Sequence, residues 1–386
     1  MDFDFTWLLF GLPIAFALGW LASRFDLHQL RVENRRAPKA YFRGLNYLLN
    51  EQQDQAIDAF IEAVQKDPDT SELHFALGNL FRRRGEYERA VRVHEHLLSR
   101  ADLGHADRER AQYALALDFL KAGLLDHAEE ALRKLDDTHH QEQAWLARLN
   151  LYERARDWTQ AAEMAGRLQA AGQTDFSGRL THYLCEQAED AMRKQGDLAG
   201  ARALLGQAID ASPDAARPRI QLAGLFAKQG NLDLALQQLM ALPAHAPRMI
   251  PLIASELVRL AKATNQLAPA RTLLQNAYQQ TPSIDIADAL VQADLSEGVP
   301  ALQARRGYVD HMAHEPSLIA AARWLNSEPF ADDDTRKALQ GSLEHAVRPL
   351  ARYRCAACGF EAQGYFWQCP GCQAWESFPP RRIEEL

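Results

Sequence analysis

The stretch that decides the fold is Ser71–Leu98, which reads SELHFALGNLFRRRGEYERAVRVHEHLL. Its first half places Leu73 and Leu77 on one side of an expected helix, and Gly85 marks where that helix ends. An apolar stripe at helical spacing starts again from Tyr87. The stretch therefore predicts a hairpin of two amphipathic helices, which needs neighbouring copies of itself to bury its apolar side.

Such copies recur along the chain. Gly44 lies 34 residues before Gly78, and Ala56 lies 34 residues before Ala90. This period resembles that of the tetratricopeptide repeat, in which small residues let paired helices cross closely. We therefore expect an all-α superhelical solenoid of about seven or eight repeats over residues 37–316, followed by a helical cap or connector over residues 317–350.

The N-terminal segment is strongly apolar. Phe5–Ala22 is 18 residues long and carries no charge, and as a helix it would span about 27 Å, close to the hydrocarbon thickness of a bilayer. It predicts a transmembrane anchor over residues 1–23. The alternative is a cleaved signal peptide, but Asp2 and Asp4 stand where such a peptide has basic residues.

Basic residues follow this segment and set its expected orientation. They are Arg24, Arg31, Arg35, Arg36, Lys39 and Arg43. Because positive charge stays on the cytoplasmic side, we expect a single-pass protein with its bulk in the cytoplasm. The linker over residues 24–36 either contacts anionic lipid headgroups or is simply solvated.

The C-terminal segment, residues 351–386, contains two Cys-x-x-Cys pairs. They are Cys355 with Cys358 and Cys369 with Cys372. Two such pairs predict one tetrahedral four-thiolate metal site, and both zinc and iron suit it. Four protein ligands leave no open position, which favours a structural role. Gly359 and Gly371 are expected to permit the tight turns beside the ligands.

The sequence gives little support for catalysis or for nucleic-acid binding. The sequence holds no nucleotide-binding loop and no hydrolase or metalloprotease motif, so we expect no catalytic residue and no enzyme activity. The net charge of −8 argues against a general nucleic-acid binder. Cys185 is expected to be a small buried residue. The histidine pairs expected on helix surfaces are His94/His96, His139/His140 and His311/His314.

The concave side of such a solenoid is formed by the first helix of each repeat. Helical phase predicts the side chains that would bind a partner there, which are Phe75, Asn79, Arg82, Arg83, Tyr113, Leu117, Lys121, Asn150 and Arg154. Arginine, asparagine and aromatic residues together are typical of protein-docking grooves. The alternative for the arginines is a solvated helix end that complements the helix dipole.

Several strings resemble one known family. They are LGNLFRRRG at Leu77–Gly85, NEQQD at Asn50–Asp54, HYLCE at residues 182–186, and the cysteine-rich segment RYRC…CGF…CP.C.AW at residues 352–375. With the apolar N-terminus and the repeats, they resemble the lipopolysaccharide assembly protein B family of Gram-negative bacteria. The similarity extends over nearly the whole chain.

The resemblance implies an inner-membrane adaptor that faces the cytoplasm and is not an enzyme. Members of the family help the membrane-bound AAA+ protease FtsH degrade the deacetylase that commits precursors to lipid A, and an inner-membrane regulator opposes them. They are also linked to lipopolysaccharide transport proteins. The resemblance further implies that the four cysteines hold the metal in a rubredoxin-like module packed against the repeats.

Two other functions stay open at this stage. One is a rubredoxin-type iron electron carrier on a protein-docking scaffold. The other is a nucleic-acid-binding zinc ribbon, favoured by Arg352, Arg354, Arg381 and Arg382 but opposed by nearby glutamates. The identity of the metal and the formation of a homo-oligomer are likewise left open by the sequence.

Overall fold

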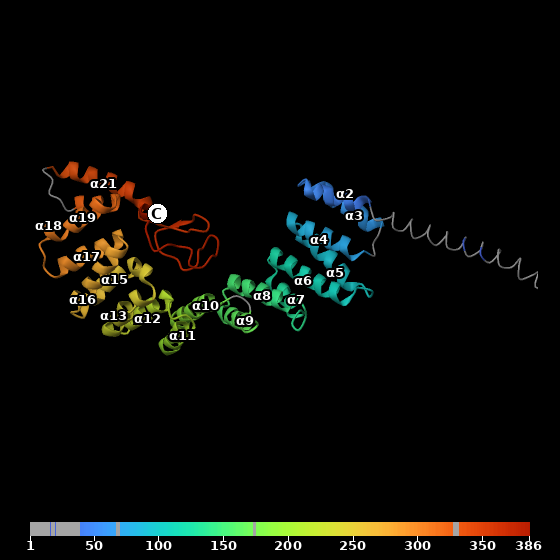
Figure 1. Ribbon diagram of the computed structural model, residues 1–386, viewed down its shortest axis with the longest axis horizontal. Coiled ribbons are helices and arrows are strands. Elements are labelled where there is room, and N and C mark those ends of the chain that lie inside the picture. The colour runs from blue at the N-terminus through green and yellow to red at the C-terminus, as the bar shows by residue number, and fades with distance from the viewer. Residues whose placement is uncertain (1–15, 17–19, 21–38, 67–69, 173–174, 327–331) are drawn as a thin grey trace, which may run out of the picture. The chain divides into compact units, whose positions relative to one another are not determined.

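The computed structural model of the chain describes Phe16, Trp20 and residues 39–66, 70–172, 175–326 and 332–386. The chain forms two compact units, of which the first ends at Ala155 and the second begins at Arg156. Each contains a row of packed helix pairs (Figure 1), and the predicted tetratricopeptide solenoid is confirmed.

The predicted membrane anchor, residues 1–23, lies outside the described residues except for Phe16 and Trp20. The basic linker, residues 24–36, lies outside them entirely. Among the residues that are described, no helix combines the length and the apolar character needed to cross a membrane.

The first unit consists of helices that pair in chain order. They are α2 (Lys39–Leu49), α3 (Gln53–Lys66), α4 (Ser71–Arg84), α5 (Tyr87–Ser99), α6 (His105–Ala122), α7 (Leu125–Arg133) and α8 (Gln141–Ala155). The hairpin predicted for Ser71–Leu98 is formed by α4 and α5. Gly85 ends α4 in a left-handed conformation, with φ of 85°, and Glu86 N–H donates back to the Phe81 carbonyl at 2.9 Å. Glycine suits this cap because it has no Cβ to clash.

Gly78 on α4 lies very close to His94 on α5. A Cβ added at Gly78 would lie 2.5 Å from the imidazole ring of His94. The expectation that His94 is a surface residue is wrong, because its side chain is fully buried and hydrogen-bonds to Asp118 on α6. His311 is also buried, beside the Tyr278 hydroxyl at 2.7 Å, so the surface expectation is wrong there too.

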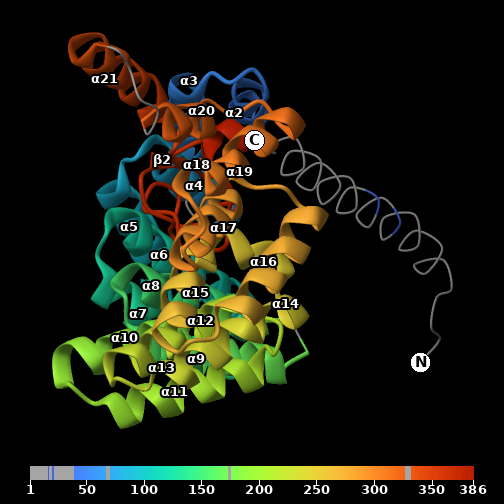
Figure 2. The same cartoon turned by 90° about the vertical axis from the view of Figure 1, so that its left-hand side faces the viewer.

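The second unit continues the helical repeats. Its first half contains α9 (Trp158–Ala170), α10 (Ser177–Asp190), a π-helical turn (Ala191–Gln195), α11 (Leu198–Ala211), α12 (Ala216–Lys228), α13 (Leu232–Met240), α14 (Leu242–His245) and a 3-10 turn (Pro247–Met249). Its second half contains α15 (Ile250–Ala263), α16 (Leu267–Gln280), α17 (Ile284–Ser296), α18 (Ala301–Ala304), α19 (Arg306–His314), α20 (Leu318–Leu325) and α21 (Asp333–Leu350). Figure 2 shows α12, α15 and α17 following one another along this unit.

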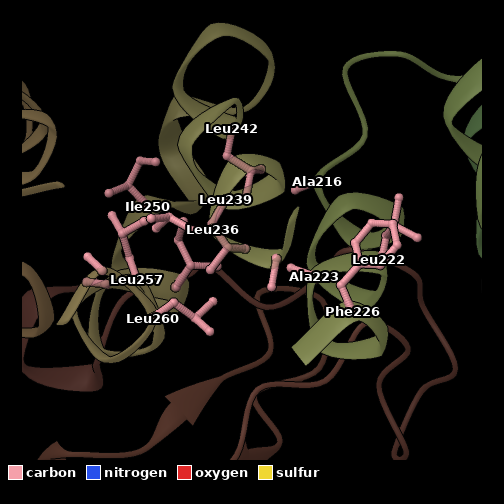
Figure 3. Close-up of a cluster of buried hydrophobic side chains, with 14 of the residues drawn as sticks. Ala216, Leu222, Ala223, Phe226, Leu236, Leu239, Leu242, Ile250, Leu257 and Leu260 are labelled. Atoms are coloured by element: carbon pink, nitrogen blue, oxygen red, sulfur yellow. The ribbon is translucent and has the colours of Figure 1, made fainter. Parts of the chain in front are cut away.

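Leucines from successive repeats form the core of the second unit. Leu236 and Leu239 on α13 face Leu257 and Leu260 on α15 (Figure 3), and all four are nearly inaccessible to solvent. Phe226 on α12 joins the same cluster. The three-residue spacing of the leucines on each helix places them on one face, toward the next helix, so the core continues from repeat to repeat. Cys185 is fully buried in this cluster, as expected.

The C-terminal segment folds into a small module. Strands β1 (Tyr353–Arg354) and β2 (Glu361–Ala362) pair antiparallel, with Tyr353 opposite Ala362. A 3-10 turn (Ile383–Glu385) ends the chain. The module lies beside the helices of the second unit (Figure 1), which places its cysteines next to the repeats.

Candidate metal centre and its seat on the repeats

Two equivalent turns present the four cysteines. In the first, Cys355 N–H donates to the Phe360 carbonyl at 2.9 Å, and Gly359 N–H donates to the Cys355 carbonyl at 2.9 Å. The second turn repeats both bonds fourteen residues later, from Cys369 N–H to Ala374 and from Gln373 N–H to Cys369, at 2.9 and 2.8 Å. Each turn therefore aims two sulfurs toward the same point.

Gly359 and Gly371 were both expected to permit the tight turns, and only Gly359 occupies the left-handed position of its turn. Gly359 has the expected positive φ, 78°, but the matching residue of the second turn is Gln373, with φ of 61°. Gly371 instead lies where an added Cβ would contact Phe360 at 3.5 Å. The second turn therefore holds a non-glycine residue in the left-handed region, which the chain tolerates at a cost of about 1 kcal/mol.

The sulfur positions fit a tetrahedral metal ion. All four Sγ atoms lie within 4.8 Å of one another, with Cys355 and Cys372 3.8 Å apart and Cys358 and Cys369 3.7 Å apart. Thiolates about 2.3 Å from a tetrahedral ion are separated by about 3.8 Å. The four cysteines thus form the predicted metal site, whose all-sulfur ligand set suits zinc and iron.

The environment of the four sulfurs shifts the pKa values of Cys355 and Cys358 in opposite directions. Burial raises the pKa of Cys355, but hydrogen bonds from the Ser377 hydroxyl and from backbone N–H groups outweigh it and lower that pKa to about 6. At Cys358 the N–H of Phe360 lowers the pKa, whereas burial and the neighbouring thiols raise it to about 12. Thiolates this close repel one another, and a bound cation would remove that repulsion.

An aromatic contact seats the module on α10. The His182 ring stacks on the indole of Trp375, with centroids 4.6 Å apart and planes 13° apart. His182 Nε2 donates to Glu376 at 3.1 Å, and this bond is the main cause that lowers the pKa of Glu376, against the effect of burial. Trp375 therefore holds the module against the repeats.

A buried arginine completes this seat. Arg217 at the start of α12 is 3% exposed and pairs with Glu186 at 2.7 Å. Its guanidinium also lies over Trp375 and Trp367, 5.8 and 5.9 Å from the ring centroids. Removing one partner of such a buried pair usually costs about 3–5 kcal/mol, so Arg217 is a strong determinant of the interface.

The last residues of the chain fasten the other side of the module. Arg382 binds both carboxylate oxygens of Asp285 on α17, at 2.8 and 3.0 Å, and its guanidinium lies 4.3 Å from the centre of the Tyr353 ring. Glu384 accepts from the first N–H groups of α20, Leu318 and Ile319, at 2.9 and 3.1 Å. These carboxylate contacts satisfy helix N–H groups that would otherwise lack partners.

The same contacts weaken the nucleic-acid alternative. Three of the four arginines that favoured it are engaged within the protein: Arg382 with Asp285, and Arg352 and Arg354 with Glu361 at 3.7 and 2.8 Å. Only Arg381 is without a salt bridge among the described residues. One remaining cation is far fewer than the several phosphate contacts that bind nucleic acid.

In the first unit, the residues expected at the docking groove divide into two sets. Several make internal contacts. Phe75 is 2% exposed beneath the Arg110 guanidinium, Arg82 pairs with buried Asp118 at 2.8 Å and also binds Asn79, and Tyr113 stacks on His140. Leu117 is half-buried. The exposed set is Arg83, Lys121, Asn150 and Arg154.

The resemblance implied that the module packs against the repeats, but the repeat residues that make this contact were not predicted. His182 entered only as part of a family string, and neither it nor Arg217 was proposed to hold the module. His182 and Glu376 are 194 residues apart in the chain, and no local pattern links residues at that separation. The aromatic residues around the second Cys-x-x-Cys pair were the one available signal.

Comparison with known proteins agrees with this architecture. Residues 353–380 match the family model described as a rubredoxin metal binding domain, and residues 43–94 and 192–252 match tetratricopeptide repeat models. The lipopolysaccharide assembly protein B of Escherichia coli (strain K12) is 30% identical over 379 residues, which cover 96% of this chain and 97% of that protein. The Haemophilus influenzae protein of the same name is 27% identical, covering 97% of this chain and 98% of that protein.

Proposed function

This chain belongs to the lipopolysaccharide assembly protein B family, and from that premise we propose that it is a non-enzymatic inner-membrane adaptor that limits lipopolysaccharide synthesis. The observation that carries the proposal is the similarity to curated relatives of that name along 96% of the chain. The repeats and the metal module are both part of the matched region. A tetratricopeptide body supports a scaffold role because its extended surface is suited to binding other proteins.

In this proposal the adaptor brings the deacetylase that commits precursors to lipid A to the membrane protease FtsH. The N-terminal apolar segment keeps the protein in the plane of the inner membrane with its body in the cytoplasm, which raises its effective concentration beside the protease. Lipopolysaccharide transport proteins and an opposing inner-membrane regulator are the further proposed partners.

The proposed docking surface uses the exposed residues of the first unit, which are Arg83, Lys121, Asn150 and Arg154. Their side chains are available to a partner without breaking a buried contact. The metal module acts structurally, since its four sulfurs close the coordination sphere of an ion. Its contacts with α10, α17 and α20 support a role in fixing the end of the solenoid.

The test is deletion of residues 1–23 in the native organism, with deacetylase levels measured by quantitative immunoblotting. We expect the deacetylase to accumulate, while the purified truncated protein keeps the circular dichroism spectrum of a folded helical body. An unrelated single-pass anchor fused at residue 24 is the matched control and should restore low levels. Deacetylase that stays low after the deletion would count against membrane confinement.

A further inference from the structure

A large cavity lies between the repeats of the second unit and the metal module. Its volume is about 1490 Å³. Part of the lining comes from the segment around α14 and from α16, and another part comes from module residues that include Trp367 and Phe378. Single small-molecule sites usually measure about 300–1,000 Å³, so this cavity has room for a longer ligand.

The walls are suited to an extended chain with apolar side chains. Met240 and Met249 line the repeat side, and prolines such as Pro247 and Pro379 line both sides. Methionine adapts its shape to different side chains, and proline presents a stiff apolar surface without a backbone N–H. Asn276 and Gln280 on α16 add amide groups that can bind a peptide backbone.

Two acidic side chains and two arginines line the cavity, and they differ in whether another side chain already binds them. Its acidic groups are already engaged, since Asp214 lies 3.3 Å from His245 and Glu376 accepts from His182 at 3.1 Å. Arg248 and Arg381 also line the cavity, and neither has a salt bridge or hydrogen bond from its side chain within the described part of the chain. Each of these arginines is therefore available to bind an anionic group of a ligand.

We propose that this cavity docks an extended segment of a partner protein in which acidic residues alternate with apolar ones. Arg248 and Arg381 bind the carboxylates, and the methionine, proline and aromatic walls take the apolar side chains. This site is separate from the docking residues proposed in the first unit. It does not depend on which enzyme the adaptor regulates.

The experiment measures peptide binding to the full-length, metal-loaded protein by fluorescence anisotropy. Three labelled peptides of about ten residues, roughly 30 Å when extended, share leucine and proline at alternate positions. The remaining positions are aspartate, asparagine or lysine. The variant is Arg248→Glu with Arg381→Glu, and the matched control is Arg306→Glu, an exposed arginine on α19 that does not line the cavity.

We expect the aspartate peptide to bind at least about tenfold more tightly than the asparagine peptide, and the lysine peptide to bind most weakly. The double variant should lose this preference, while Arg306→Glu keeps it. Arg248→Gln with Arg381→Gln provides the same test if the glutamate variant does not fold. Hydrogen exchange should show protection of α16 and of residues 376–381 by the aspartate peptide.

Equal affinity for the aspartate and asparagine peptides, or an unchanged preference in both double variants, would overturn the proposal. So would protection confined to another part of the chain. Vesicles of phosphatidylglycerol form a further arm. Vesicle binding that requires Arg248 and Arg381, in the absence of peptide binding, would assign the site to lipid phosphate instead.

Discussion

The imidazole of His182 lies flat against the indole of Trp375, with ring centroids 4.6 Å apart. One ring belongs to a repeat helix and the other follows the last metal-binding cysteine by three residues. The contact therefore joins the metal module directly to the solenoid. Trp158 and Tyr183 meet the same indole edge-on, at 6.0 and 6.2 Å, so Trp375 is the centre of an aromatic cluster.

Truncating the Trp375 side chain should lower the stability of the second unit. We expect Trp375→Ala to lower the free energy of unfolding by about 3 kcal/mol, because large-to-small changes in packed aromatic clusters lose contacts and leave a cavity. Urea denaturation followed by circular dichroism measures the change. Leu302→Ala, at a side chain that is 74% exposed, is the control and should change stability by less than about 0.5 kcal/mol. Equal effects of the two substitutions would contradict the clamp.

Removing two ligands should remove the metal. Cys355→Ser with Cys358→Ser is expected to release the ion and lower the melting temperature, since metal binding supplies folding free energy to so small a module. Elemental analysis and calorimetry measure both effects, and an unchanged melting profile would count against a structural ion. Cys185→Ala is the control and should keep the ion, because Cys185 is not one of the four cysteines whose sulfurs cluster, and burial raises the pKa of its thiol to about 12. A visible absorption spectrum of the purified protein separates iron from zinc.

The contact between Gly78 and His94 predicts a sensitive position in the first unit. Gly78→Ala should destabilise the protein by about 1–3 kcal/mol, because the new methyl group would lie 2.5 Å from the fully buried His94 ring and force a shift in packing. Gly224→Ala on α12 is the matched control. An added Cβ there meets nothing within 4 Å, and alanine favours a helix by roughly 1 kcal/mol. The midpoint of chemical denaturation should therefore fall for Gly78→Ala and rise for Gly224→Ala.

The hydrogen bond from His182 predicts the titration of Glu376. It lowers the pKa of Glu376 below the ordinary value of 4.5, so the carboxylate stabilises the folded state above pH 4.5 and this stabilisation is lost as the pH falls through the folded-state pKa. Carbon-13 NMR of the side chain should show a midpoint below 4.5. His182→Phe keeps an aromatic ring but removes the donor, and should raise the midpoint. A midpoint that is the same in both proteins would exclude the bond as the cause.

The repeats and the metal ligands could be predicted because their signals are local. Apolar residues three and four apart assign one face of a helix, and Gly85 ends α4 because its own backbone adopts the left-handed conformation. The cysteine pairs likewise predict a metal site, since two cysteines three residues apart can bind the same ion from a single turn. These features depend on neighbours in the chain, and the structure confirms them.

Only the tertiary structure decided how the parts meet. It buried His94 against Gly78, placed Gln373 rather than Gly371 in a left-handed turn, and used Arg382 to bind Asp285. The physical reason is that burial and pairing depend on which surfaces pack together, and the partners here are up to 194 residues apart. The sequence thus determined a row of helix hairpins and a metal module, whereas packing determined that His182, Arg217 and Trp375 join them.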